Sequence, residues 1–154
     1  MTLSDIEVQD LPAQATAVVQ HRVTLQDMDR IPGWLGETYE AVQRSGVEPA
    51  GMPFLRTLAM DEDGMEIEVG WPVPAPFAGD GDVHASSLPD GPAAVVSYFG
   101  PFDGVAGAYE ALGAWCGQHG REVAGPPWET YYTDPEQEPD QSKWRTDVHF
   151  PLRG

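Results

Sequence analysis

The sequence predicts an α+β fold in which one βαββ block is used twice, with two helices on one side of a largely antiparallel sheet. Three observations predict it. Short motifs recur in the same order in both halves of the chain. Each half has a β-branched run, a helical pattern and two further strand patterns. Finally, 17 Gly and 15 Pro among 154 residues favour many turns over long helices.

The repeat is visible in three pairs of segments, each pair similar in residue type and order. They are Glu48-Pro-Ala-Gly-Met-Pro-Phe54 with Glu122-Val-Ala-Gly-Pro-Pro-Trp128, Met65–Val73 with Trp144–Leu152, and Ala17–Val19 with Ala94–Val96. A period of about 75 residues is too long for a solenoid repeat and indicates a duplicated supersecondary block. We therefore expect a single domain over 1–154, with a first repeat over about 6–73, a linker over about 74–92 and a second repeat over about 93–152.

In the first repeat, strands are predicted over Ile6–Leu11 and Ala15–Val23, followed by a helix over about Asp29–Ser45. The apolar face of this helix is formed by Ile31, Leu35, Tyr39 and Val42. Two strands follow, Met52–Met60 and Met65–Trp71, and the Asp61–Gly64 segment between them is typical of a hairpin turn.

The second repeat has the same order of elements. A strand over Ala93–Phe99 precedes a helix over about Asp103–His119, whose apolar face is formed by Val105, Ala106, Tyr109, Leu112 and Cys116. Strands over Pro127–Thr133 and Trp144–Phe150 are joined by a polar loop. Asp29 and Asp103 are expected as helix N-caps, and Gly46 and Gly120 as left-handed residues after the helices.

Composition excludes several classes of function. The net charge of −17 and the absence of a Lys/Arg cluster argue against direct binding to nucleic acid or to an anionic membrane surface. No signal peptide or membrane-length apolar run is recognised, and the single cysteine, Cys116, suits a reducing compartment as a buried, inert thiol, so a cytoplasmic protein is expected. The four histidines show no zinc-binding spacing, and we expect neither a metal nor a cofactor.

The two repeats differ at one pair of positions in a way that suggests function. Aligning the strands after each Gly-x-Pro places Glu129 where the first repeat has Leu55, and Tyr131 where it has Thr57. Strand alternation puts Glu129 and Tyr131 on one face, opposite to Trp128. An inward carboxylate is costly unless a cation or a hydrogen-bond donor meets it. Alternation alone leaves open whether this face is buried or in solvent.

The segment Gly125-Pro-Pro-Trp-Glu-Thr-Tyr-Tyr-Thr-Asp-Pro135, with Phe99-Gly-Pro-Phe102 before it and Thr146–Pro151 after it, resembles the GyrI-like small-molecule-binding domain. The resemblance extends over Ile6–Leu152. That family includes the effector domains of multidrug-responsive bacterial regulators. The resemblance implies two βαββ modules with pseudo-two-fold symmetry and a ligand groove between the modules. It also implies a central pocket glutamate, which corresponds to Glu129, with Tyr131 beside it.

The resemblance implies a stand-alone protein that binds amphipathic, aromatic and cationic compounds, for sensing, sequestration or detoxification. Cations are attracted to aromatic faces, and a desolvated carboxylate completes the charge match. The aromatic residues expected as pocket walls are also residues that commonly form a core: Trp34, Tyr39, Trp71, Tyr98, Phe99, Tyr109 and Trp115. The chain leaves no room for a helix-turn-helix domain, so direct DNA binding is not expected.

Two alternatives remain open. Some stand-alone relatives are hydrolases that open the cyclopropane ring of DNA-alkylating toxins. Here Glu129 would be the base, and Tyr131 or Tyr39 would polarise the carbonyl of the substrate. The second alternative is a protein-interaction role like that of a gyrase inhibitor. An exposed edge strand would also allow a homodimer.

Overall fold

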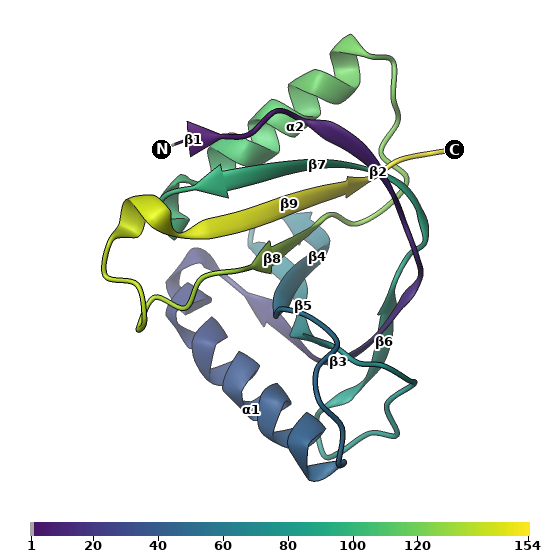
Figure 1. The fold of residues 1–154 in the computed structure, drawn as a ribbon, viewed down its shortest axis with the longest axis vertical. Coiled ribbons are helices and arrows are strands. Elements are labelled where there is room, and N and C mark those ends of the chain that lie inside the picture. The colour runs from purple at the N-terminus through teal and green to yellow at the C-terminus, as the bar shows by residue number, and fades with distance from the viewer. Residues whose placement is uncertain (1) are drawn as a thin grey trace. The chain divides into compact units, whose positions relative to one another are not determined.

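The computed structural model describes residues 2–154 and has an antiparallel α+β fold with two helices (Figure 1). Its elements form two compact units. The first unit is Pro12–Asp90, and the second is Gly91–Gly154 together with the N-terminal residues up to Leu11. Neither helix within residues 2–154 has the length and apolarity needed to cross a bilayer.

The first unit is an antiparallel sheet covered by one helix. Its strands run in the order β4-β5-β3-β6, and α1 packs against β5 and β3. The face of α1 that carries Trp34, Thr38, Ala41 and Val42 is buried. The bounds of these elements are β3 (Gln14–Val23), α1 (Ile31–Arg44), β4 (Phe54–Asp61), β5 (Gly64–Pro72) and β6 (His84–Leu88), with a 3₁₀ turn η1 (Leu25–Arg30) before α1.

The second unit has the same plan. Strand β7 pairs with β9, β9 pairs with β8, and the N-terminal strands β1 and β2 both pair with β7. Figure 1 shows α2 beside β7, and the helix also contacts β9. The bounds are β1 (Thr2–Leu3), β2 (Glu7–Leu11), β7 (Gly91–Phe99), α2 (Ala106–Gln118), β8 (Trp128–Tyr131) and β9 (Arg145–Pro151), with 3₁₀ turns η2 (Phe102–Gly104) and η3 (Gln141–Lys143).

The core of the second unit forms where α2 covers β7 and β9. Apolar side chains from these three elements meet there because alternation along each strand directs every second residue to the helix. Cys116 belongs to this core, as the sequence predicts, and is 4% exposed. The cluster consists of Ala94, Val96, Tyr98, Ala108, Leu112, Cys116, Val148 and Leu152.

Equivalent strands have the same register in the two units. Val69 of β5 pairs with Val19 of β3 and Leu55 of β4. Its counterpart Val148 of β9 pairs with Val96 of β7 and Glu129 of β8. Leu55 and Glu129 therefore have the same position in their respective sheets, as the alignment of the repeats predicts.

The helix ends agree with the sequence at one end and differ at the other. Gly46 and Gly120 have φ angles of 83° and 63°, which confirms the left-handed residues predicted after α1 and α2. The prediction that Asp29 and Asp103 are N-caps is wrong. A 3₁₀ turn precedes each helix, so the helices begin later. Thr24 caps the turn η1 that leads into α1, and it forms a capping box with Asp27.

The segment expected to be the linker between the repeats contains strand β6. Residues His84–Leu88 pair antiparallel with β3, on the side of β3 that does not carry β5. The backbone groups along that edge of β3 need hydrogen-bond partners, and β6 supplies them. Its polar, small side chains give no strand signal of their own in the sequence.

Candidate functional site

Strand β8 directs Glu129 and Tyr131 to the α2 side of the second unit. Glu129 pairs with Val148, which lies in the core under α2, so both side chains share the face of that core. Trp128 faces the other way, is 4% exposed, and stacks on His149 with ring centroids 5.0 Å apart. The alternation predicted from the sequence is therefore confirmed, and the carboxylate lies on the face toward α2.

Two tyrosine hydroxyls hold the Glu129 carboxylate. Tyr109, from α2, donates to Oε1 at 2.6 Å, and Tyr131, from the same strand, donates to Oε2 at 2.9 Å. All three residues are half-buried. Within the described part of the second unit, Glu129 forms no ion pair with a Lys, Arg or His. Among the described residues of its own unit, the carboxylate therefore has neutral donors and no ion-pair partner.

Burial dominates the electrostatics of this group. Desolvation raises the pKa of Glu129, while the hydrogen bonds from Tyr109 and Tyr131 act to lower it. Desolvation and the nearby Glu129 charge raise the pKa values of both tyrosines. Tyr109 and Tyr131 therefore stay neutral donors at physiological pH. A cation placed at this carboxylate would relieve the cost of its burial.

Aromatic side chains, named here the aromatic shell, contact the two tyrosines that hold Glu129. Phe102 meets the Tyr131 ring edge-on at 5.7 Å and stacks on Trp144 at 5.1 Å. Phe150 lies 5.8 Å from Tyr109. None of these three aromatic residues is among the pocket walls predicted from the sequence. Phe102 and Phe150 lie in motifs that carry the family resemblance, but nothing in those motifs separates a wall from a core residue.

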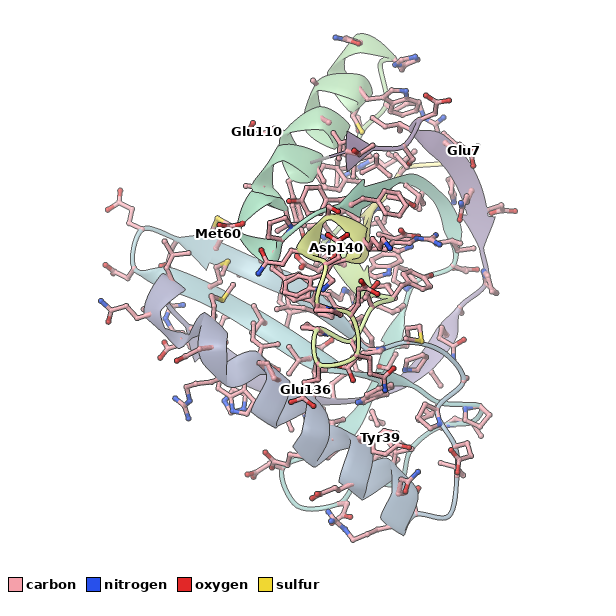
Figure 2. The ribbon with its side chains drawn as sticks, turned by 60° about the vertical axis from the view of Figure 1, so that its left-hand side comes forward. Glu7, Tyr39, Met60, Glu110, Glu136 and Asp140 are labelled. Atoms are coloured by element: carbon pink, nitrogen blue, oxygen red, sulfur yellow. The ribbon has the colours of Figure 1, made fainter. Side chains whose placement is uncertain are left out.

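Trp144 fixes one side of this shell. Its indole Nε1 donates to the Glu138 carbonyl at 2.7 Å, within the acidic loop between β8 and β9. Figure 2 shows that loop at the surface, with Glu136 and Asp140 labelled. The loop therefore holds the Trp144 ring against Phe102, and Phe102 in turn lies against Tyr131.

Three of the predicted walls belong to the first unit. Tyr39 and Trp71 form a tilted pair with centroids 5.1 Å apart, and Trp71 Nε1 donates to the Leu35 carbonyl at 3.0 Å. Trp34 stacks on His21 at 3.9 Å and is 7% exposed. Each of these contacts stabilises the first unit, and their role as ligand walls stays a prediction.

The remaining predicted walls lie in the second unit. Tyr98 is fully buried in the core, where its hydroxyl donates to the Pro101 carbonyl at 2.6 Å. Phe99 is half-buried on the opposite face of β7, and Trp115 stacks on His119 at 4.3 Å. Of the residues predicted for the site, the second unit joins Tyr109 and Tyr131 to Glu129.

A polar groove lies on the outer face of the second unit's sheet. It has a volume of about 350 Å³. Its most buried charge, Asp147, is matched by a bidentate ion pair with Arg145 at 2.9 Å, so the Glu129 site is the stronger candidate. The groove is lined by Ser4, Asp5, Glu7, Gln9, Val95, Ser97, Arg145 and Asp147. Within residues 2–154 no cluster of three or more His, Cys, Asp or Glu side chains is arranged to hold a metal ion.

Comparison with solved structures gives close matches of fold. The C-terminal domain of EcmrR matches with a TM-score of 0.86 at 19% identity, covering 97% of each chain. The chain spans 57% of the EcmrR chain seen in a complex with DNA. SAV2435 bound to tetraphenylphosphonium matches with a TM-score of 0.64 at 14% identity, covering 98% of this chain and 95% of that one. A hydrolase from Listeria innocua matches with a TM-score of 0.64 at 13% identity, covering 96% and 91%.

No curated protein sequence is significantly similar to this chain. The family comparison is decisive, because the profile of the GyrI-like small molecule binding domain matches residues 4–153. The chain therefore belongs to the GyrI-like small-molecule-binding domain family.

Proposed function

We propose that this protein binds amphipathic, aromatic cations, with Glu129 as the group that meets the positive charge. The observation that carries the proposal is the half-buried carboxylate, which is held by Tyr109 and Tyr131 and forms no ion pair with any described residue of its own unit. A buried carboxylate without a counter-ion is costly, and proteins retain such groups where function uses them.

The chemistry around Glu129 favours a delocalised cation. Phe102, Trp144 and Phe150 offer ring faces and edges near Tyr109 and Tyr131. Aromatic faces attract positive charge, and the attraction grows when water is excluded. Tetraphenylphosphonium, which is bound by the structural neighbour SAV2435, has this combination of charge and aromatic surface.

The other repeat supplies an internal comparison. Leu55 has the position of Glu129 and is 3% exposed, so a leucine is sufficient for packing there. Folding therefore does not require a carboxylate at this position. Ligand recognition is the simplest reason for its presence in the second unit.

The test is a titration monitored by tryptophan fluorescence and by calorimetry. Tetraphenylphosphonium should bind, and tetraphenylborate, which has the same shape and the opposite charge, should not. Glu129→Gln keeps the shape of the side chain and should weaken binding of the cation about tenfold or more. Glu110→Gln is the control, since Glu110 is an exposed glutamate on α2 (Figure 2). Equal affinity of both variants for the cation would refute the proposal.

A hydrolase is the second candidate, favoured by the raised pKa of Glu129 beside two tyrosine donors. A carboxylate with a raised pKa is a stronger base, and a tyrosine hydroxyl can polarise a substrate carbonyl. Opening a cyclopropane ring by hydrolysis adds one water, so the product is heavier by that mass. If mass spectrometry detects no such product after incubation with a cyclopropanoid, this candidate fails for that substrate.

A further inference from the structure

Thr146 of β9 has a hydroxyl that is buried without a partner. The residue is 0% exposed, and Oγ1 has no hydrogen bond to any described residue. Leaving a buried hydroxyl unpaired costs free energy, so each such group calls for an explanation. The repeat shows that packing is not the explanation, because the equivalent residue of the first unit is Ile67, which is also 0% exposed.

Thr146 lies on the same face as Glu129. It pairs directly with Tyr131 on β8 and with Tyr98 on β7. Directly opposed residues in an antiparallel sheet have Cβ atoms about 5 Å apart, and diagonal neighbours such as Glu129 lie at about 7–8 Å. The distance between the carboxylate and the threonine hydroxyl is therefore within the span of one small molecule.

The other hydroxyls of this row already donate. Tyr98 donates to the Pro101 carbonyl, and Tyr131 donates to Glu129. Among these three residues, which lie side by side across the sheet, Thr146 alone has a hydroxyl hydrogen without an acceptor in the described chain. An oxygen atom on a ligand would supply the missing acceptor.

Comparison of the units places Thr146 in a set of substitutions. Leu55, Thr57 and Ile67 lie on one face of the first unit's sheet, and Glu129, Tyr131 and Thr146 have the equivalent positions in the second. Relative to the first unit, Glu129 adds an acid, Tyr131 enlarges a hydroxyl-bearing side chain, and Thr146 introduces a hydroxyl. Their concentration on one face indicates that the three side chains serve one site.

We propose that Thr146 is a ligand-binding residue of the Glu129 site, where its hydroxyl donates to an oxygen acceptor on the bound aromatic cation. The proposal rests on the proposed function. It adds a ligand class, aromatic cations that carry a carbonyl or ether oxygen. Because the hydroxyl is out of reach of solvent, such a ligand reaches it when Tyr131 leaves its bond to Glu129. The cation then replaces Tyr131 beside the carboxylate.

The test uses Thr146→Val, which keeps the shape of the side chain and removes the hydroxyl. Thr16→Val is the matched control, since Thr16 of β3 is 1% exposed and also has an unpartnered Oγ1. Both variants should unfold at a urea concentration at or above that of the wild type, because each loses an unsatisfied buried hydroxyl. This readout shows that both variants fold.

Two probes separate the hydroxyl from the charge. They are (4-acetylphenyl)triphenylphosphonium and its 4-isopropenyl counterpart, in which a CH₂ group replaces the carbonyl oxygen. The wild type should bind the acetyl probe more tightly than the isopropenyl probe. Thr146→Val should weaken binding of the acetyl probe roughly tenfold and leave the other unchanged. Thr16→Val should change neither affinity.

Three results would overturn the inference. The wild type could bind both probes equally, Thr146→Val could preserve the difference between them, or both threonine variants could weaken binding alike. A wild type that binds neither these probes nor tetraphenylphosphonium would refute the proposed function itself, and the role of Thr146 with it. Binding that needs Glu129 but ignores Thr146 would refute the inference alone.

Discussion

The hydrogen bond from Tyr109 to Glu129 should depend on the charge of the carboxylate. At 2.6 Å this contact is short for a hydroxyl donor, as expected when the acceptor is ionised. Removing the hydroxyl with Tyr109→Phe should lower the free energy of unfolding by about 2 kcal/mol at about pH 8, because hydrogen bonds to charged groups contribute about 1.5–3 kcal/mol. In the Glu129→Gln background the same bond is neutral, and its loss should cost about 1 kcal/mol.

A double-mutant cycle measures the difference. Urea unfolding of the wild type, Tyr109→Phe, Glu129→Gln and the double variant should give a coupling energy of about 1 kcal/mol. That value corresponds to roughly a fivefold change in the unfolding equilibrium constant. Unchanged m-values would show that the denatured states are comparable. Additive costs would refute the reasoning, because they would mean that Tyr109 does not sense the charge of Glu129.

Three further predictions follow from the same structure. Burial raises the pKa of Glu129 above its usual value of 4.5, so the folded state holds a proton that the unfolded state releases. The free energy of unfolding should therefore fall as pH rises from about 4.5 through the raised pKa of folded Glu129. In urea unfolding, Glu129→Gln should remove this part of the pH dependence. An unchanged dependence of stability on pH in that variant would contradict the prediction. Gly46→Ala and Gly120→Ala should each lower the free energy of unfolding by about 1 kcal/mol because both glycines have positive φ angles. Gly113→Ala should raise the free energy of unfolding, because Gly113 lies within α2 and has open space where a Cβ would be. Cys116 should react with thiol reagents only after urea unfolds the protein, because burial raises the pKa of its thiol and blocks access to it. Rapid reaction of Cys116 with a thiol reagent in the folded protein would contradict its place in the core.

The sequence predicted most of the strands because their signals are local. The strands that became β3, β5, β7 and β9 have alternating or β-branched patterns, and their observed bounds differ from the predicted ones by at most two residues. The left-handed glycines after both helices were also predictable, since glycine tolerates positive φ. Strand β6 was missed because its pairing depends on the edge of β3, not on its own residues.

The hydrogen-bonded cluster that forms the candidate site was predictable to the extent that the repeat exposed it. Comparing the two strands identified Glu129 and Tyr131, and helical spacing placed Tyr109 on the inward face of α2. Composition and spacing did not identify Phe102 and Trp144, because their roles arise from contacts between an η2 turn, a loop and β8. Such contacts depend on tertiary packing, for which a single sequence gives no local signal.

The duplicated fold explains how a costly site is tolerated. The first unit has apolar residues at two of the three compared positions, Leu55 and Ile67, both of which are fully packed. The second unit replaces them with Glu129 and Thr146, which introduce a desolvated carboxylate and an unpaired hydroxyl. Each replacement lowers stability by the cost of burying a polar group. The core beneath α2 remains apolar, and hydrophobic burial there offsets that cost. Under the proposed function, the unit without the polar face shows what folding alone requires, and the unit with it shows the side chains that ligand recognition would add.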